Sequence, residues 1–148
     1  MGGMVSKLAI VDASLVIKAI LPNSENAASQ AVLAHLHNVQ LAAPALWVYE
    51  ITSTFAKAVH FGQITEEEGG LAIRQALALG VQIILPDETQ SLLAYQWTLK
   101  LNRAAAYDSF YLAIAEVLEA DFWTADQRLI RSLETEKLKW LHWVGEMQ

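Results

Sequence analysis

Residues 105–115, which read AAYDSFYLAIA, combine an apolar run with a single carboxylate. If a helix covers residues 107–119, Asp108 lies on the same face as Leu112 and Ala115. That face is otherwise apolar and should meet the core, where a leucine would be the ordinary choice. A carboxylate at such a position indicates a function for Asp108 other than packing.

Residues 121–126, which read DFWTAD, follow shortly afterwards. The run 122–124 predicts a short buried strand, and Asp126 comes where the chain leaves it. The same arrangement occurs near the N-terminus, where residues 8–11 predict a strand and Asp12 follows. The carboxyl ends of parallel strands meet at one edge of a sheet, and open α/β sheets bind ligands at that edge.

Predicted strands and helices alternate along the whole chain. Strands are predicted at 8–11, 39–41, 81–85, 122–124 and 141–144, and helices at 14–21, 24–37, 45–61, 66–79, 88–101, 107–119 and 127–133. This alternation indicates an α/β fold with a mostly parallel central sheet covered on both faces, a three-layer α/β/α arrangement. A chain of 148 residues is expected to form a single domain over 1–148, with residues 1–6 as a flexible N-terminal tail.

Local signals predict where several helices begin and end. Thr65 followed by Glu68 predicts a capping box. Asn102 suits a left-handed residue after a helix. Asn23 or Ser24 is expected to cap the second helix, and Pro44 is expected in the first turn of the third, where a missing N–H is tolerated.

The composition excludes several classes of protein. The chain has no cysteine, which excludes disulfides, iron–sulfur clusters and thiolate zinc sites and leaves oxygen and imidazole ligands, a set that favours hard cations. The net charge of −6 argues against nucleic-acid binding by a broad basic surface. Hydrophobic residues make up 54% of the chain, above the roughly 45–50% of an average protein, so a partner or second copy is expected to cover some apolar surface.

No membrane segment is expected. Residues 26–49 carry no Asp, Glu, Lys or Arg and are long enough to span a bilayer. That run nevertheless contains polar side chains throughout and is interrupted by Pro44. The apolar segment 8–21 is broken by Asp12 and Lys18, unlike the central region of a signal peptide. The expected location is the cytoplasm.

Four acids, Asp12, Glu50, Asp108 and Asp126, are predicted at strand exits or on inward helical faces, and we call them the acidic quartet. Several carboxylates in one place repel each other unless a cation screens them. Mg²⁺ prefers such oxygen ligands, and Mn²⁺ accepts the same set. A bound ion of this kind lowers the pKa of water and neutralises charge on a phosphoryl oxygen, the chemistry of phosphodiester hydrolysis.

Two hydroxyl side chains are predicted near the quartet. Ser14 and Thr124 each lie two residues from a quartet aspartate and are expected to orient it by hydrogen bonds. Taken singly, each quartet acid also has a structural explanation. Either strand-exit aspartate can cap a helix, Asp108 can be a first-turn acid, and Glu50 can pair with Lys57 or be solvated.

Four segments together resemble the PIN-domain proteins, specifically the VapC-like toxins of bacterial toxin–antitoxin pairs. The matching segments are VDAS at 11–14, Pro44 through Ile51, YDSFYLAIA at 107–115 and TADQRL at 124–129. The resemblance implies a Mg²⁺-dependent endoribonuclease, usually a homodimer, silenced by a cognate antitoxin. The acidic quartet matches the acidic residues of the family. Ser109 is a departure, since the family most often has alanine there.

The resemblance also directs attention to residues that could contact RNA or a protein partner. The basic side chains close in sequence to the quartet are Lys18, Arg103 and Arg128. Trp47 and Trp123 are expected in the core, and the tryptophans that could line a dimer or antitoxin surface are Trp97, Trp140 and Trp143. The alternative function is a catalytically silent PIN-like or receiver-like module that binds a partner, although a receiver would have adjacent acids where Asp12 stands alone.

Overall fold

The computed structural model describes residues 7–21, 26–103 and 106–147, so the predicted tail at 1–6 lies outside the described residues. Its centre is one five-stranded sheet whose pairs are all parallel, in the order β3-β2-β1-β4-β5. The strands are β1 Leu8–Val11, β2 Gln40–Pro44, β3 Gln82–Ile84, β4 Asp121–Thr124 and β5 Leu141–Trp143. The predicted α/β fold with a parallel sheet is confirmed.

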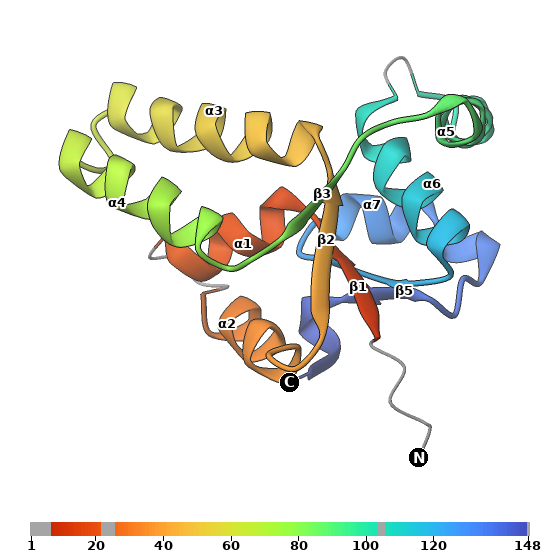
Figure 1. Cartoon of the computed structure of the whole chain (residues 1–148), viewed down its shortest axis with the longest axis horizontal. Helices are drawn as coiled ribbons and strands as arrows, with labels where there is room; N and C mark the ends of the chain where they lie inside the picture. Colours follow the sequence, from red (N-terminus) through yellow and green to blue (C-terminus); the bar gives the residue numbers. More distant parts are fainter. Residues whose placement is uncertain (1–6, 22–25, 104–105, 148) are drawn as a thin grey trace.

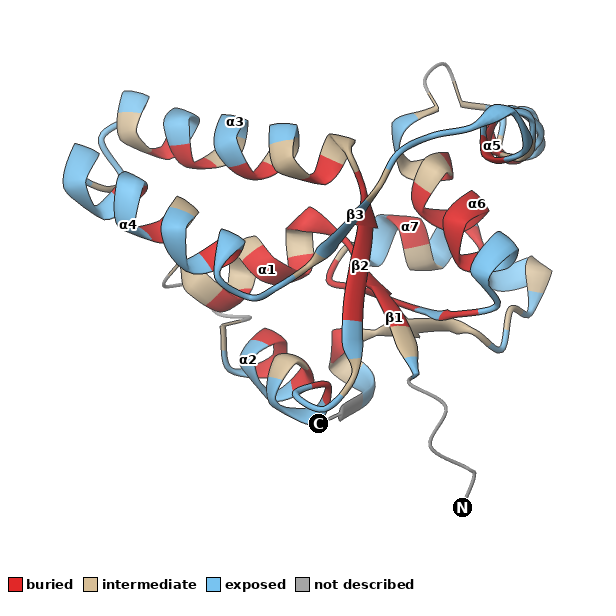
Figure 2. Cartoon of the chain, viewed as in Figure 1, coloured by how far each residue is buried: buried red, intermediate tan, exposed pale blue. Residues whose placement is uncertain are grey.

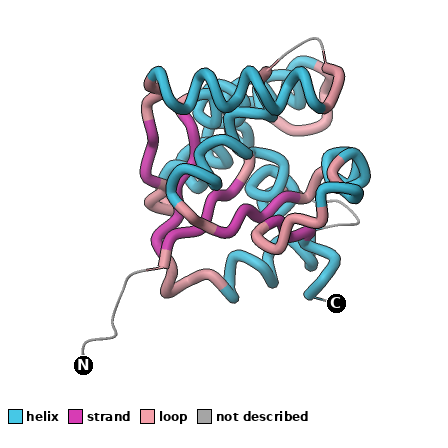
Figure 3. Tube along the Cα trace, turned by 90° about the vertical axis from the view of Figure 1, so that its right-hand side faces the viewer, coloured by secondary structure: helices cyan, strands magenta, loops and turns pink. Residues whose placement is uncertain are grey.

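Helices lie on both sides of the sheet (Figure 1). They are α1 Ala13–Ile20, α2 Asn26–His35, α3 Leu46–His60, α4 Glu66–Leu77, α5 Glu88–Lys100, α6 Tyr107–Leu118 and α7 Gln127–Ser132. In Figure 1, α1 to α4 occupy the left of the sheet, whereas α5 and α6 occupy the right. Figure 3 shows the strands running between these helices. Within the described ranges, no helix is both long and apolar enough to cross a bilayer.

The helix ends follow local chemistry. Thr65 and Glu68 form the predicted capping box at the start of α4, and Asp87 caps α5. Gly62 and Asn102, which follow α3 and α5, have φ of 74° and 53°, the left-handed conformation that ends helices. The expected cap of α2 at residues 23–24 lies outside the described residues.

Pro44 corrects the sequence prediction. It ends β2, paired with Ile84 of β3, and α3 starts only at Leu46. The predicted strand at 39–41 was therefore too short. Pairing between β1 and β2 reaches only Ala42, so the missing N–H of Pro44 removes no bond from that ladder.

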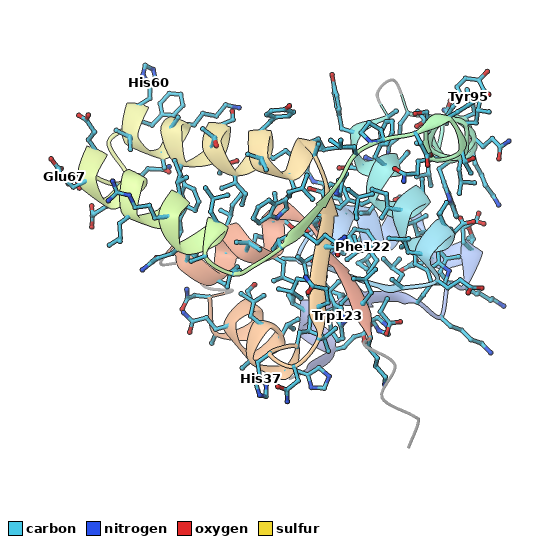
Figure 4. The ribbon with its side chains drawn as sticks, in the orientation of Figure 1. His37, His60, Glu67, Tyr95, Phe122 and Trp123 are labelled. Carbon is cyan, nitrogen blue, oxygen red and sulfur yellow. The ribbon has the colours of Figure 1, made fainter. Side chains whose placement is uncertain are left out.

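The core is built mostly from β1, β2, β4 and the inner helix faces, which are largely red in Figure 2, whereas the edge strands β3 and β5 hold no buried residue. Trp47 and Trp123 are buried as predicted, and Trp123 lies centrally beside Phe122 in Figure 4. The expectation of an exposed Trp97 was wrong, because this ring is only 7% exposed and its Nε1 donates a hydrogen bond to Glu116. Trp140 and Trp143 are half-buried and pack against the core.

The strand order creates a switch point between β1 and β4. From β1 the chain builds the sheet outward through β2 and β3, then returns to add β4 and β5 on the other side. Val11 and Trp123 are paired in register, so Asp12 and Thr124 come next at the same edge. Crevices at such switch points are where open α/β sheets bind ligands.

Candidate active site

Asp12 is the most constrained member of the quartet. It directly follows β1 and caps α1, where its Oδ1 accepts a hydrogen bond from the Leu15 backbone N–H at 3.1 Å. The same oxygen accepts from Ser14 Oγ at 2.7 Å, and Oδ2 accepts from Thr124 Oγ1. The residue is 7% exposed. Its carboxylate is therefore held in one orientation by groups from both β1–α1 and β4.

Burial raises the pKa of Asp12 from 3.8 to about 6. The hydrogen bonds from Thr124, Ser14 and Leu15 act in the opposite direction, and the negative charge of Asp126 adds to the rise. Since a raised pKa means that the charged form is disfavoured, the ionised carboxylate is energetically costly in the protein without a cation.

Asp126 lies two residues after the end of β4. It caps α7, with Oδ1 accepting from the backbone N–H groups of Arg128 at 3.0 Å and Leu129 at 3.3 Å. Its own N–H donates to Thr124 Oγ1 at 2.9 Å. Thr124 thus contacts the Asp12 side chain and the Asp126 backbone at once. Asp126 therefore caps α7, and its charge also acts on Asp12. The two roles are compatible.

Glu50 reaches the site from α3 and is positioned by a residue that the sequence analysis did not single out. Tyr111 Oη donates to Glu50 Oε1 at 2.7 Å, and the tyrosine ring stacks on Phe122 with centroids 5.6 Å apart. Burial raises the pKa of Glu50, the Tyr111 bond lowers it, and the charges of Asp12 and Asp108 raise it. A tyrosine on a predicted buried face was the available signal, because a buried phenol needs a partner.

Asp108 lies in the first turn of α6, and its side chain is 39% exposed. Arg103 Nη1 is 3.4 Å from its Oδ2. Burial raises the pKa of Asp108, as does the charge of Asp126, whereas Arg103 lowers it. The neighbouring Ser109 is buried and accepts a hydrogen bond from Thr98 Oγ1 at 2.9 Å, which ties α6 to α5. Ser109 therefore serves helix packing.

The four carboxylates share one electrostatic environment. Asp126 acts on Asp12 and Asp108, and these two act on Glu50. Within the described ranges, however, no three acidic or histidine side chains are close enough to hold one ion. Arg103 and Tyr111 hold two of the carboxylates by separate contacts. The donor set is oxygen only and mutually repelling, which fits a hard cation, and a single ion shared by all four stays a prediction.

Comparison with known proteins decides the family. Residues 10–143 match the family model of the PIN domain. This chain belongs to the PIN domain family. No curated protein matches its sequence significantly. The predicted family resemblance is therefore confirmed at the level of the domain.

Solved structures share the fold of this PIN domain at low identity. The PAE2754 protein of Pyrobaculum aerophilum is similar with 18% identity and a TM-score of 0.69, over 99% of this chain and 90% of that one. A chain of a toxin–antitoxin complex from Klebsiella pneumoniae is similar with 16% identity and a TM-score of 0.64, over 90% of this chain and 94% of that one. VapC20 of Mycobacterium tuberculosis, a toxin that cleaves the sarcin-ricin loop, is similar with 11% identity and a TM-score of 0.61, over 84% of this chain and 94% of that one.

The PIN domain carries a basic hollow of about 430 Å³ beside Asp126. Its lining includes Lys18 and Arg128, two of the basic residues that the sequence analysis named as candidate RNA contacts. It also includes Arg131, which the sequence analysis missed. Arg131 lies three residues after Arg128 on α7, a spacing that places two side chains on one helix face. Lys18 Nζ donates to the carbonyl oxygen of Ala125 at 3.3 Å, which brings the ammonium to the end of β4.

Proposed function

We propose that this PIN-domain chain is a metal-dependent endoribonuclease and the toxin of a toxin–antitoxin pair. It would act in the cytoplasm as one domain over residues 1–148. The observation that carries the proposal is the set of raised pKa values at Asp12, Glu50 and Asp108, each partly caused by another quartet carboxylate. Neighbouring carboxylates that raise one another's pKa values lower the stability of the metal-free protein. A cation that binds among them would offset this cost.

The quartet residues Asp12, Glu50, Asp108 and Asp126 would hold Mg²⁺, or Mn²⁺ in its place. Such an ion, when bound, supplies a water of lowered pKa and neutralises charge on a phosphoryl oxygen. Asp12 accepts hydrogen bonds from Thr124 Oγ1 and the N-terminus of α1. Asp126 accepts from the N-terminus of α7 and donates its own N–H to Thr124 Oγ1, so both residues are positioned before any ligand arrives. Burial raises the pKa of Glu50 in the metal-free protein, and the hydrogen bond from Tyr111 holds its carboxylate in place.

RNA as the substrate is supported by the basic groups around an otherwise acidic centre. Lys18, Arg128 and Arg131 line one hollow with Asp126, where they can contact backbone phosphates. Arg103 lies beside Asp108 and can exchange that carboxylate for a phosphate oxygen. The fold shared with VapC20, a toxin that cleaves the sarcin-ricin loop, favours RNA over other phosphodiesters.

An antitoxin partner and a homodimer belong to the same proposal. The shared fold with a chain of the Klebsiella pneumoniae toxin–antitoxin complex supports a protein inhibitor. The outer face of α5 presents a row of apolar side chains, Leu92, Tyr95 and Leu99, which are more than half exposed. Tyr95 is labelled on this outer face in Figure 4. An exposed apolar row of this kind marks a protein contact and supports the second copy expected from the composition.

The test is cleavage of labelled RNA by the purified chain. Wild-type protein should cleave with Mg²⁺ or Mn²⁺, and EDTA should abolish cleavage. Asp108→Asn should be inactive while folded, by circular dichroism and melting. Asp87→Asn is the matched control, since Asp87 caps α5 outside the site and should tolerate the change. A folded wild type that cleaves no RNA with either metal would contradict the proposal and leave a partner-binding role.

A further inference from the structure

A second hollow, of about 390 Å³, opens beside Glu50. We call it the tyrosine cleft, and its lining includes Tyr49, Glu50, Ser53, Thr54 and Lys57 of α3 with Tyr107 of α6. It shares no described lining residue with the basic hollow beside Asp126. One quartet carboxylate lines each hollow, Glu50 the tyrosine cleft and Asp126 the basic hollow.

Two aromatic rings in this cleft are open to solvent. Tyr49 is 71% exposed and Tyr107 is 68% exposed, and they come from different helices. Tyr111, by contrast, is 2% exposed and uses its hydroxyl to hold Glu50. Packing explains Tyr111 but not the two exposed rings. Paired exposed aromatic side chains next to a catalytic group offer flat apolar surfaces to a ligand.

The remaining lining residues are the apolar Leu46 and three polar residues, Ser53, Thr54 and Lys57, whose side chains suit a nucleotide. Ser53 and Thr54 lie three and four residues after Glu50, one helical turn on, and offer hydroxyls to a base edge or a ribose 2′-OH. Lys57 lies one further turn along α3 and offers an ammonium to a backbone phosphate. Stacking on aromatic rings, with cations along the backbone, is how proteins bind single-stranded RNA.

Resting on the proposed nuclease function, we propose that the tyrosine cleft is the subsite for one unpaired RNA base next to the scissile phosphate. The base stacks on Tyr49 and Tyr107, and Lys57 contacts the phosphate beyond it. Stacking tolerates any base, because every base has a flat aromatic face. The cleft therefore selects for an unpaired nucleotide rather than for a particular sequence.

The experiment measures affinity for fluorescent homopolymeric oligoribonucleotides by anisotropy, with Ca²⁺ as the cation, and a gel checks that the RNA stays intact. Tyr49→Ala and Tyr107→Ala should each weaken binding about five- to one-hundred-fold. Tyr49→Phe should bind like the wild type because it keeps the ring. Phe61→Ala is the matched control, since Phe61 is an aromatic residue, 72% exposed at the end of α3, that does not line the cleft.

A second measurement identifies the stacked base. One abasic nucleotide is placed at each position of the oligomer in turn, and one position should weaken wild-type binding most. That loss should largely disappear in Tyr49→Ala, because the two changes remove the same contact and do not add. Fully additive losses would overturn the proposal. Unchanged RNA affinity in both alanine variants would also overturn it. If the sedimentation of these variants changes while their RNA affinity does not, the tyrosines contact a second copy of the chain instead of RNA.

The two proposals fail in different ways. A wild type that shows the stacking pattern but cleaves nothing with Mn²⁺ would overturn the nuclease activity and leave the cleft assignment standing. If the wild type cleaves RNA and neither Tyr49→Ala nor Tyr107→Ala changes RNA affinity, the cleft assignment alone is overturned. A wild type that binds no RNA would overturn both.

Discussion

Replacing Asp12 by asparagine should stabilise the metal-free protein at neutral pH. An asparagine oxygen can still accept the bonds from Leu15 N–H and Ser14 Oγ, and Asn caps helices about as well as Asp. The substitution removes a negative charge that burial and the charge of Asp126 disfavour. A gain in stability at a candidate catalytic residue would show that its charge is kept for binding rather than for folding.

The magnitude follows from the pKa of Asp12, about 6 in the folded protein against 3.8 for an ordinary aspartate. This gap corresponds to about 3 kcal/mol, since each pH unit is worth about 1.4 kcal/mol. Altering the bond with Thr124 costs about 1 kcal/mol, which leaves a net gain of about 2 kcal/mol. The folded state binds the proton more tightly, so the free energy of unfolding of the wild type falls as pH rises through this window.

The assay is urea unfolding of both proteins in EDTA. The gain of Asp12→Asn should be present at about pH 7.5 and close to zero at about pH 4.5, where the carboxyl is protonated in the folded wild type. Asp87→Asn, a cap substitution away from the quartet, should change little at either pH. Excess Mn²⁺ should reverse the order, because only the wild type keeps the full ligand set.

Two results would refute this reasoning. One is an Asp12→Asn protein less stable than the wild type in EDTA at neutral pH. The other is a gain that persists undiminished at acidic pH, since the benefit would then come from something other than the lost charge.

Two further predictions concern the other quartet residues. Asp126→Asn keeps the cap of α7 but removes the charge that acts on Asp12 and Asp108, so the melting midpoint in EDTA should rise and the Mn²⁺-induced increase should shrink at constant ionic strength. A wild-type response to Mn²⁺ would place Asp126 outside the ion site. Tyr111→Phe removes a hydrogen bond that lowers the pKa of Glu50, so the acid limb of the plot of cleavage rate against pH should move to higher pH. An unmoved limb would exclude Glu50 as the group whose ionisation sets that limb.

Much of the architecture was predictable from local patterns. Within the described residues, the five strands and seven α-helices were expected in the right order, because apolar periodicity and capping residues depend on neighbours within one or two turns. The same reasoning placed Asp12 directly after one strand and Asp126 shortly after another. It was wrong where two local explanations compete, as for Pro44, which suits a first helical turn and also a strand end.

Local patterns could not determine which side chains meet. Tyr111 and Glu50 are 61 residues apart, and Thr124 and Asp12 are 112 apart, yet each pair is hydrogen-bonded. The burial of Trp97 likewise depends on the packing of α5 against α6.

The sequence alone predicted the four residues of the quartet, whereas the hydrogen-bond partners of these residues and their electrostatic coupling were decided by the tertiary structure. Placing Thr124 beside Asp12 requires β4 to pair with β1 so that Val11 faces Trp123. A shift of one residue would turn every side chain of β4 to the other face of the sheet. Register of this kind is set by the packing of the whole sheet and its helices, which no short segment specifies.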